Sequence, residues 1–138
     1  MDLFTIGEMT SIIRMKSDKV KNWMAGKPFK FEPSAKSARG RGSRNIYQRQ
    51  DLYLLSIANE FSKAGFAGKA IGRLLTAIRP RLARLNHDSV LTVWRTTPGG
   101  PFHLGTGRDK PAGIVLWHVF EIGALLRAID ERIESLGR

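Results

Sequence analysis

The sequence of 138 residues contains no cysteine. Disulfides, thiolate metal sites and cysteine nucleophiles are therefore excluded. Long apolar runs are also missing, because no stretch approaches the roughly 18 uncharged apolar residues that a membrane-spanning helix needs. Residues 1–4 lack the basic start and the apolar run of a signal peptide. We therefore expect a cytoplasmic protein without a membrane partner, built as one domain or one small domain with an appendage.

Acidic residues are scarce, with 12 Asp and Glu against 23 Lys and Arg, so the formal net charge is +11. Residues 1–84 hold 17 of the basic and 6 of the acidic side chains, whereas residues 85–138 hold 6 of each. Within residues 27–49, seven basic side chains face Glu32 alone. Such a cluster favours a polyanion, either nucleic acid or an anionic membrane surface. The alternative is a solvated face that serves solubility.

Two short helices are predicted at the N-terminus. Thr5 followed by Glu8 forms a capping box, and the apolar spacing after it predicts a helix over residues 6–13. Ser17 is expected to cap a second helix over residues 18–25, which Gly26 ends. Two helices joined by the short break at residues 14–16, the second basic on its outer side, are typical of a helix-turn-helix.

The basic segment that follows predicts a β-hairpin. Phe29 and Phe31 alternate with charged residues, which indicates a strand, and residues 44–47 are expected to form the returning strand. Between them, residues 33–43 are rich in Gly, Ser and Arg and predict a long basic tip. The hairpin would then be a wing beside the two helices.

The rest of the chain predicts two more helices and a small α+β unit. A third helix begins at Gln50 and ends near Gly65, and a fourth carries Ile71 and Leu75 until Pro80 stops it. The segments predicted to follow are a connector at 81–88, strands at 89–95 and 113–119, and a helix from about residue 120 to 136. The fold class is therefore mainly α with small β. We expect residues 1–80 to form a winged helix-turn-helix domain, and residues 81–138 to add a β-hairpin and a C-terminal helix as a dimerisation or effector region.

The apolar stripe of the C-terminal helix is close to a heptad seam. Two interpretations stay open, because the stripe can cover the local sheet or can meet a second copy of the chain. We expect a mixture of the two, with a dimer interface formed by Ile122, Leu126, Ile129, Ile133 and Leu136.

Four stretches of the first part of the chain form a pattern together. They are Phe4-Thr5-Ile6-Gly7-Glu8, Val20-Lys21-Asn22-Trp23, Arg44-Asn45-Ile46-Tyr47 with Asp51-Leu52, and Ala64-Gly65-Phe66 with Ile71 and Leu75. In order and spacing these stretches resemble the MerR-type winged helix-turn-helix DNA-binding family over about residues 3–80. The resemblance implies a dimer that contacts two operator halves and distorts the DNA between them. The metal-sensing members of that family use cysteines, which this chain lacks.

The second helix supplies the candidate base contacts. Lys19 and Lys21 can donate to guanine O6 and N7 or to phosphate, and Asn22 has the donor and acceptor that suit adenine. Ser17 at the helix start and Lys16 just before it suit phosphate oxygens.

The wing and two aromatic residues complete the predicted DNA-binding set. Arg39, Arg41 and Arg44 fit phosphate or minor-groove contacts. Tyr47 can pack with its ring and offer its hydroxyl group to a phosphate. Trp23 is either a core anchor or a base reader, and the core position is the commoner use of such a residue.

Catalysis has little support, because His87, His103 and His118 are scattered and form no triad or ligand spacing. We expect no enzyme activity, no cofactor and no metal site. The predicted function is a sequence-specific transcriptional regulator that binds a pseudo-palindromic duplex as a homodimer. RNA polymerase is a further expected partner, and the protein would be nucleoid-associated. The alternatives are a phage excisionase-like or architectural DNA-bending factor, and an RNA-binding module.

Overall fold

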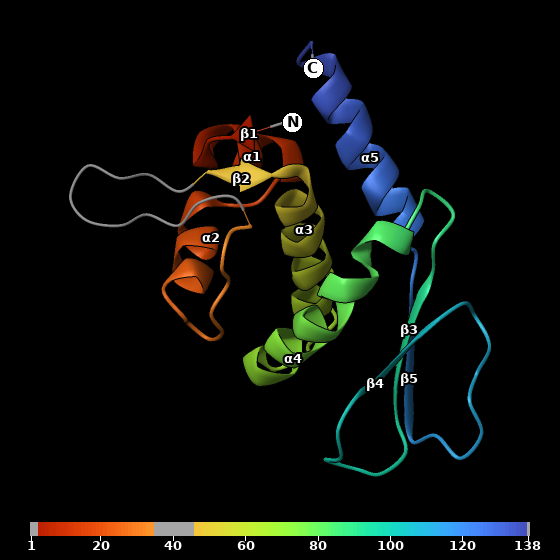
Figure 1. The fold of residues 1–138 in the computed structure, drawn as a ribbon. Coiled ribbons are helices and arrows are strands. Elements are labelled where there is room, and N and C mark those ends of the chain that lie inside the picture. The colour runs from red at the N-terminus through yellow and green to blue at the C-terminus, as the bar shows by residue number, and fades with distance from the viewer. Residues whose placement is uncertain (1–2, 35–45, 138) are drawn as a thin grey trace.

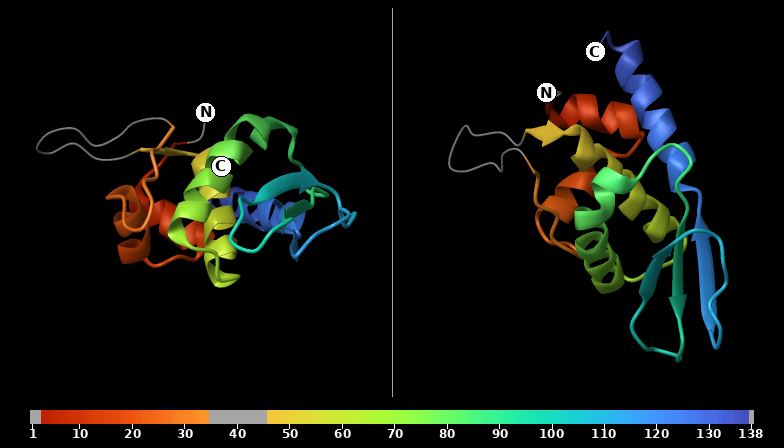
Figure 2. Two further views of the ribbon diagram at one scale, coloured as in Figure 1. Left: turned by 90° about the horizontal axis from the view of Figure 1, so that it is seen from below. Right: turned by 45° about the vertical axis from the view of Figure 1, so that its right-hand side comes forward.

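The computed structural model describes residues 3–34 and 46–137, which form five α-helices and two small antiparallel sheets (Figure 1). The chain is thus a mixed α and β protein, and α2 and the larger sheet lie on opposite sides of α3 (Figures 1 and 2). No helix in the described ranges is long and apolar enough to cross a bilayer. In chain order the elements are β1 (Leu3–Phe4), α1 (Ile6–Ile13), α2 (Ser17–Met24), β2 (Tyr47–Gln48), α3 (Arg49–Lys63), α4 (Gly68–Ile78), the 3₁₀ helix η1 (Arg79–Arg84), β3 (Leu91–Arg95), β4 (His103–Thr106), β5 (Leu116–Phe120) and α5 (Ile122–Ser135).

Helix α1 begins and ends where the sequence predicts. The Thr5 amide donates to Glu8 Oε1 at 3.0 Å, and the Glu8 amide donates to Thr5 Oγ1 at 3.2 Å, so the predicted capping box is confirmed. The helix stops because Arg14 adopts a left-handed conformation with φ of 57°. The predicted break at residues 14–16 is therefore confirmed as a sharp turn into α2.

Helix α2 begins one residue earlier than predicted. Lys16 occupies the N-cap position without a side-chain hydrogen bond, and Ser17 is already helical, so the predicted Ser17 cap is wrong. The other end matches the prediction, since Gly26 has φ of 88° just beyond the last turn. Lys30 Nζ donates to the Met24 carbonyl at 2.5 Å, which places a cation at the negative end of the helix dipole.

The predicted hairpin between residues 29–31 and 44–47 is wrong. Strand β2 pairs instead with β1, with Tyr47 opposite Phe4. Phe29 and Phe31 are buried outside any strand, and the Phe31 amide donates to the Trp23 carbonyl at 3.0 Å. Their alternation reflects two rings that pack around the end of α2 rather than one face of a strand. The predicted tip includes residues 35–43, which lie outside the described residues.

Helix α3 ends in the turn that the sequence predicts at residues 64–66. Gly65 has φ of 92°, and its amide donates to the Ser62 carbonyl at 3.0 Å. The Phe66 amide donates to the Phe61 carbonyl at 3.1 Å, and the two rings lie 5.6 Å apart. These two bonds with an apolar contact form a Schellman motif, which directs the chain into α4.

Helix α4 ends at Ile78, close to the predicted stop at Pro80. The chain nevertheless continues as η1, so the predicted connector at 81–88 is partly helical. Proline has no N–H to continue an α-helical ladder, whereas the first turn of a new helix tolerates it.

The larger sheet has the order β4-β3-β5, with β3 antiparallel to both neighbours. The sequence predicts β3 and β5 but misses β4, which is short, contains Gly105 and lies at the sheet edge. One sheet face packs on the end of α3, where Phe61 lies 4.9 Å from Phe120 and Phe66 lies 5.0 Å from His118. The sheet is therefore joined to the helices by an aromatic cluster.

Helix α5 turns its apolar stripe toward the chain's own core. It packs on α1 and α3, and Arg132 Nη1 donates to the Ile12 carbonyl at 2.8 Å. One buried cluster includes residues from both 1–80 and 81–138, and the division between them stays a prediction. The predicted interface residues Ile122, Leu126, Ile129 and Ile133 are at most 2% exposed, whereas Leu136 is 53% exposed.

Gly123 at the start of α5 is required by a close backbone approach. A Cβ atom there would lie 2.3 Å from the His87 carbonyl oxygen, whereas one at Gly7 would meet nothing closer than 3.9 Å. Both glycines are the second residue of a helix. We expect Gly123→Ala to lower the free energy of unfolding by about 1–3 kcal/mol through overpacking. Chemical denaturation should show Gly7→Ala raising it by up to about 1 kcal/mol. Equal effects at the two positions would contradict this packing.

Candidate nucleic-acid interface

Helix α2 presents a polar stripe to solvent. Asp18, Lys21, Asn22 and Ala25 are exposed and follow helical spacing, whereas Val20 on the opposite side is fully buried. The buried side holds the helix against α1, and the stripe faces away from it. Three side chains that can donate or accept hydrogen bonds, or do both, are therefore held outward in a fixed order.

Three predicted contacts are turned toward the rest of the molecule instead, with Lys19 half-buried and Trp23 and Tyr47 buried. Lys19 Nζ donates to Asn59 Oδ1 at 2.7 Å and lies 5.2 Å from the centre of the Trp23 ring, so this cation points toward α3. Trp23 is 4% exposed, and its ring lies 4.9 Å from the Phe29 ring. Of the two roles considered for Trp23, this is the position of a core anchor. Tyr47 in β2 is fully buried, so its hydroxyl group does not reach a phosphate on the surface.

The N-terminal end of α2 matches the expectation more closely. Lys16 is exposed and Ser17 is partly exposed, both at the first turn, where the initial amides have no partner within the helix. Of the predicted helix contacts, Lys16, Ser17, Lys21 and Asn22 therefore lie on the accessible surface. The wing residues Arg39, Arg41 and Arg44 lie outside the described residues.

The buried carboxylate of Asp51 links Ser34 to Gln48. It accepts hydrogen bonds from the Ser34 amide at 3.0 Å, the Ser34 hydroxyl group at 2.7 Å and the Gln48 amide at 2.8 Å. Asp51 also belongs to the capping box of α3. This carboxylate thus holds Ser34 and Gln48 together at the first turn of α3.

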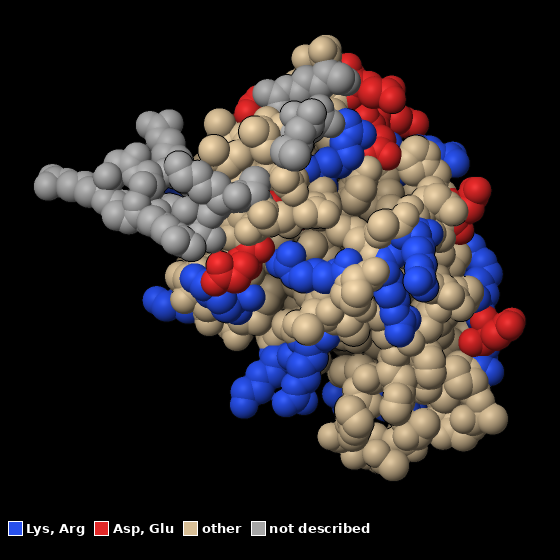
Figure 3. Space-filling view, in the orientation of Figure 1, with Lys and Arg blue, Asp and Glu red and all other residues tan. Residues whose placement is uncertain are grey.

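A second basic surface lies around α4, and the sequence analysis does not predict it. Residues 61–87 hold six Lys and Arg and no Asp or Glu, which is the signal that could have found it. Lys69 and Arg73 lie one turn apart on the exposed face of α4. Lys and Arg side chains gather over α2, residues 27–34 and α4, whereas Asp and Glu gather over α5 (Figure 3).

Close contacts along residues 27–34 connect α2 to α4. Pro28 packs on Gly68, where a Cβ atom would lie only 2.3 Å from the proline ring. Farther along, the Arg79 guanidinium lies 5.1 Å from the centre of the Phe31 ring and donates to the Glu32 carbonyl at 3.0 Å. Residues 27–34 therefore bring the two basic surfaces next to each other.

Asp130 on α5 is the centre of a separate polar cluster that sequence reasoning missed. Its carboxylate accepts from Arg49 Nη1 at 3.2 Å, pairs with His87 Nε2 at 2.6 Å and accepts from the Tyr53 hydroxyl group. Burial opposes ionisation of Asp130, but the Tyr53 and His87 hydrogen bonds and the Arg49 charge lower its pKa overall. Burial and the Asp130 bond raise the pKa of Tyr53 to about 12. The cluster ties α5 to α3 and to the chain before β3.

We expect Asp130→Asn to lower the free energy of unfolding by about 1–2 kcal/mol at pH 7. Because the folded pKa of Asp130 lies below its unfolded value, the stabilisation is complete above about pH 4. It is lost as the pH falls through the folded pKa. Chemical denaturation from pH 7 to pH 2 should show the two proteins converging at low pH, and a constant difference would contradict an electrostatic role.

The described ranges show no centre for metal chemistry. No group of three or more His, Asp or Glu side chains there is arranged to hold a metal ion. Comparison with protein-family models and with curated proteins finds no match for this chain. The case for a function therefore rests on the surface chemistry.

Proposed function

We propose that this chain is a duplex DNA-binding protein that reads sequence through α2. In this proposal, α1 and α2 act as a helix-turn-helix and α2 enters the major groove. The observation that carries the proposal is the exposed stripe of Asp18, Lys21 and Asn22, held outward by the burial of Val20 and Trp23.

The three side chains of the stripe suit different base edges. The Lys21 ammonium can donate to guanine O6 and N7, and the Asn22 carboxamide can pair with adenine N6 and N7. The Asp18 carboxylate can accept from cytosine N4. Together they give the helix hydrogen-bonding groups for three different bases, which is sufficient to discriminate among short sequences. This supports a role as a sequence-specific transcriptional regulator.

Cations around α2 supply the phosphate contacts. Lys16 and Lys27 are exposed beside the two ends of α2, and backbone contacts of this kind set the position of a recognition helix without reading sequence. We expect the affinity to fall steeply with salt, because each neutralised phosphate releases condensed counterions.

The proposal includes two copies of the chain on a pseudo-palindromic site. A single α2 spans only a few base pairs, and a two-fold arrangement doubles the sequence that is read. The α5 stripe is buried, so the copies would meet through another surface or through the end of α5 at Leu136. Sedimentation of the protein on a bound duplex should give two chains per site.

A titration of fluorescent duplex against competitors tests the proposed class. We expect unlabelled duplex to compete better than structured RNA of equal length. Stronger competition by RNA would favour the RNA-binding module instead. Tight duplex binding that shows bending but no sequence preference would favour the architectural alternative.

A further inference from the structure

A basic groove lies between α4 and the larger sheet. It has a volume of about 460 Å³ and is formed by α4, the start of η1, the end of β3 and the chain through β4. Four cationic side chains line it, and none of the lining residues is acidic. The cations are Lys69, Arg73, Arg81 and Arg95.

The cations come from both sides of the groove. Lys69 and Arg73 are exposed on α4, and Arg81 Nη1 donates to the Leu104 carbonyl at 3.4 Å, which brings it against β4. The Arg95 guanidinium lies 3.9 Å from the centre of the Phe102 ring. Its buried Nε atom has no hydrogen-bond partner among the described residues.

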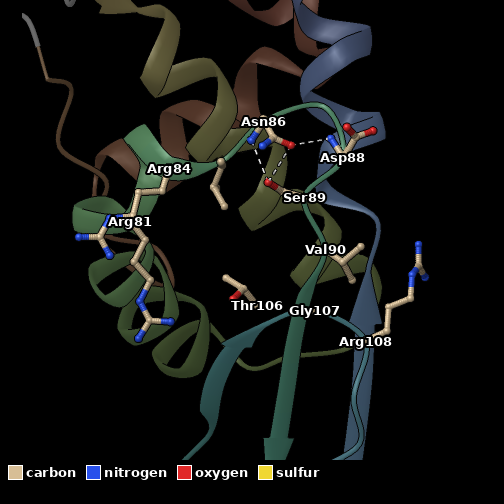
Figure 4. A pocket seen from close by; sticks show the side chains of 10 residues that line it. Arg81, Arg84, Asn86, Asp88, Ser89, Val90, Thr106, Gly107 and Arg108 are labelled. Carbon is tan, nitrogen blue, oxygen red and sulfur yellow. Dashed lines mark hydrogen bonds between the residues drawn. The ribbon is translucent and has the colours of Figure 1, made fainter.

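The charge of this groove is not balanced by carboxylates. A neighbouring cavity beside η1, of about 700 Å³, offers the contrast (Figure 4). That cavity includes Asp88, and its Arg108 extends away from Arg81 and Arg84 and pairs with Glu121 at 2.5 Å. None of the four groove cations has an ion-pair partner in the part of the chain that the structure describes.

We propose that the groove between α4 and the larger sheet binds phosphate groups. Four neighbouring cations repel one another unless an anion occupies the space between them. Arginine guanidinium groups match the oxygens of phosphate in a bidentate geometry, and lysine adds a point charge. The phosphate can belong to a free phosphate-bearing molecule or to the DNA backbone beyond α2. The site rests on its own geometry and does not depend on base reading by α2.

Inorganic pyrophosphate and a short duplex are the two probes, each measured by calorimetry on the full chain. We expect Arg73→Gln to weaken binding of at least one probe by about 10-fold, the usual effect of losing a charged hydrogen bond. Arg127→Gln is the matched control, because Arg127 is exposed on α5 and the change in net charge is the same. Lys69→Gln provides a second variant in the groove and should act as Arg73→Gln does.

The two probes separate the sources of phosphate. If the groove variants bind pyrophosphate more weakly but bind duplex normally, the site belongs to a free phosphate-bearing ligand. If they bind duplex more weakly but bind pyrophosphate normally, the site belongs to the DNA backbone. Equal binding of both probes by the groove variants and Arg127→Gln overturns the proposal. The proposal that α2 reads sequence is tested separately, by loss of base discrimination in α2 variants. Failure of the groove proposal can therefore be distinguished from failure of that proposal.

Discussion

Replacing Lys21 and Asn22 with alanine is expected to remove most of the sequence discrimination of the proposed interface. Both side chains are exposed on α2, so the substitutions delete hydrogen-bonding groups without opening the core. A good contact to a base edge contributes about 1–3 kcal/mol of discrimination, so each substitution should lower the discrimination ratio by about 5- to 150-fold. Competition between a preferred duplex and a scrambled duplex measures this ratio directly.

Controls at matched charge and exposure sharpen that test. Lys63→Ala removes an exposed lysine from the end of α3, where it pairs with Glu60 at 3.6 Å, and should leave the ratio unchanged. Lys16→Ala should weaken preferred and scrambled duplexes alike, because a phosphate contact carries no sequence information. If Lys21→Ala and Lys63→Ala gave the same ratio, α2 would not be the reading helix.

Trp23→Ala is expected to lower the free energy of unfolding by about 3–5 kcal/mol, the usual effect of truncating a buried aromatic side chain. The ring is 4% exposed, contacts Phe29 and lies beneath the Lys19 ammonium. Since small proteins are stable by only about 5–15 kcal/mol, the loss should be visible as a large fall in the denaturation midpoint.

Trp23→Phe separates a core role from base reading. Phenylalanine keeps an apolar ring in the core, so this variant should be much more stable than Trp23→Ala and should keep the duplex preference of the unchanged protein. A folded Trp23→Phe protein that binds duplex without sequence preference would show instead that the indole contacts bases.

Local signals explain what the sequence could predict about the fold. Three predicted features depend only on neighbouring residues, and the structure contains all three. They are the Thr5 and Glu8 capping box, the glycine after α2 and the turn at residues 64–66. The bounds of α1 follow from these signals because a helix start or stop is satisfied within a few residues.

Long-range packing explains the errors. The alternation at Phe29 and Phe31 looks like a strand, but both rings are drawn into the core around α2 and α4, and β2 finds its partner at β1. Periodicity identifies which residues of α5 are apolar without telling whether this chain or a second copy covers them. Here α1 and α3 cover the stripe.

The candidate site could be predicted only in part, because the charge of a residue does not tell which way its side chain points in the folded protein. Lys19 and Lys21 are two residues apart on one helix, yet the first bonds to Asn59 and the second faces solvent. The basic groove combines residues from α4, η1 and β3, which only the folded chain brings together.

Selection of bound sequences from a random duplex library tests the central claim most directly. The unchanged protein is expected to enrich a short motif, arranged as two inverted halves, and the protein with Lys21→Ala and Asn22→Ala is expected to lose that motif while retaining salt-dependent binding. Enrichment of no motif by the unchanged protein, or of the same motif by both proteins, would contradict sequence reading through α2.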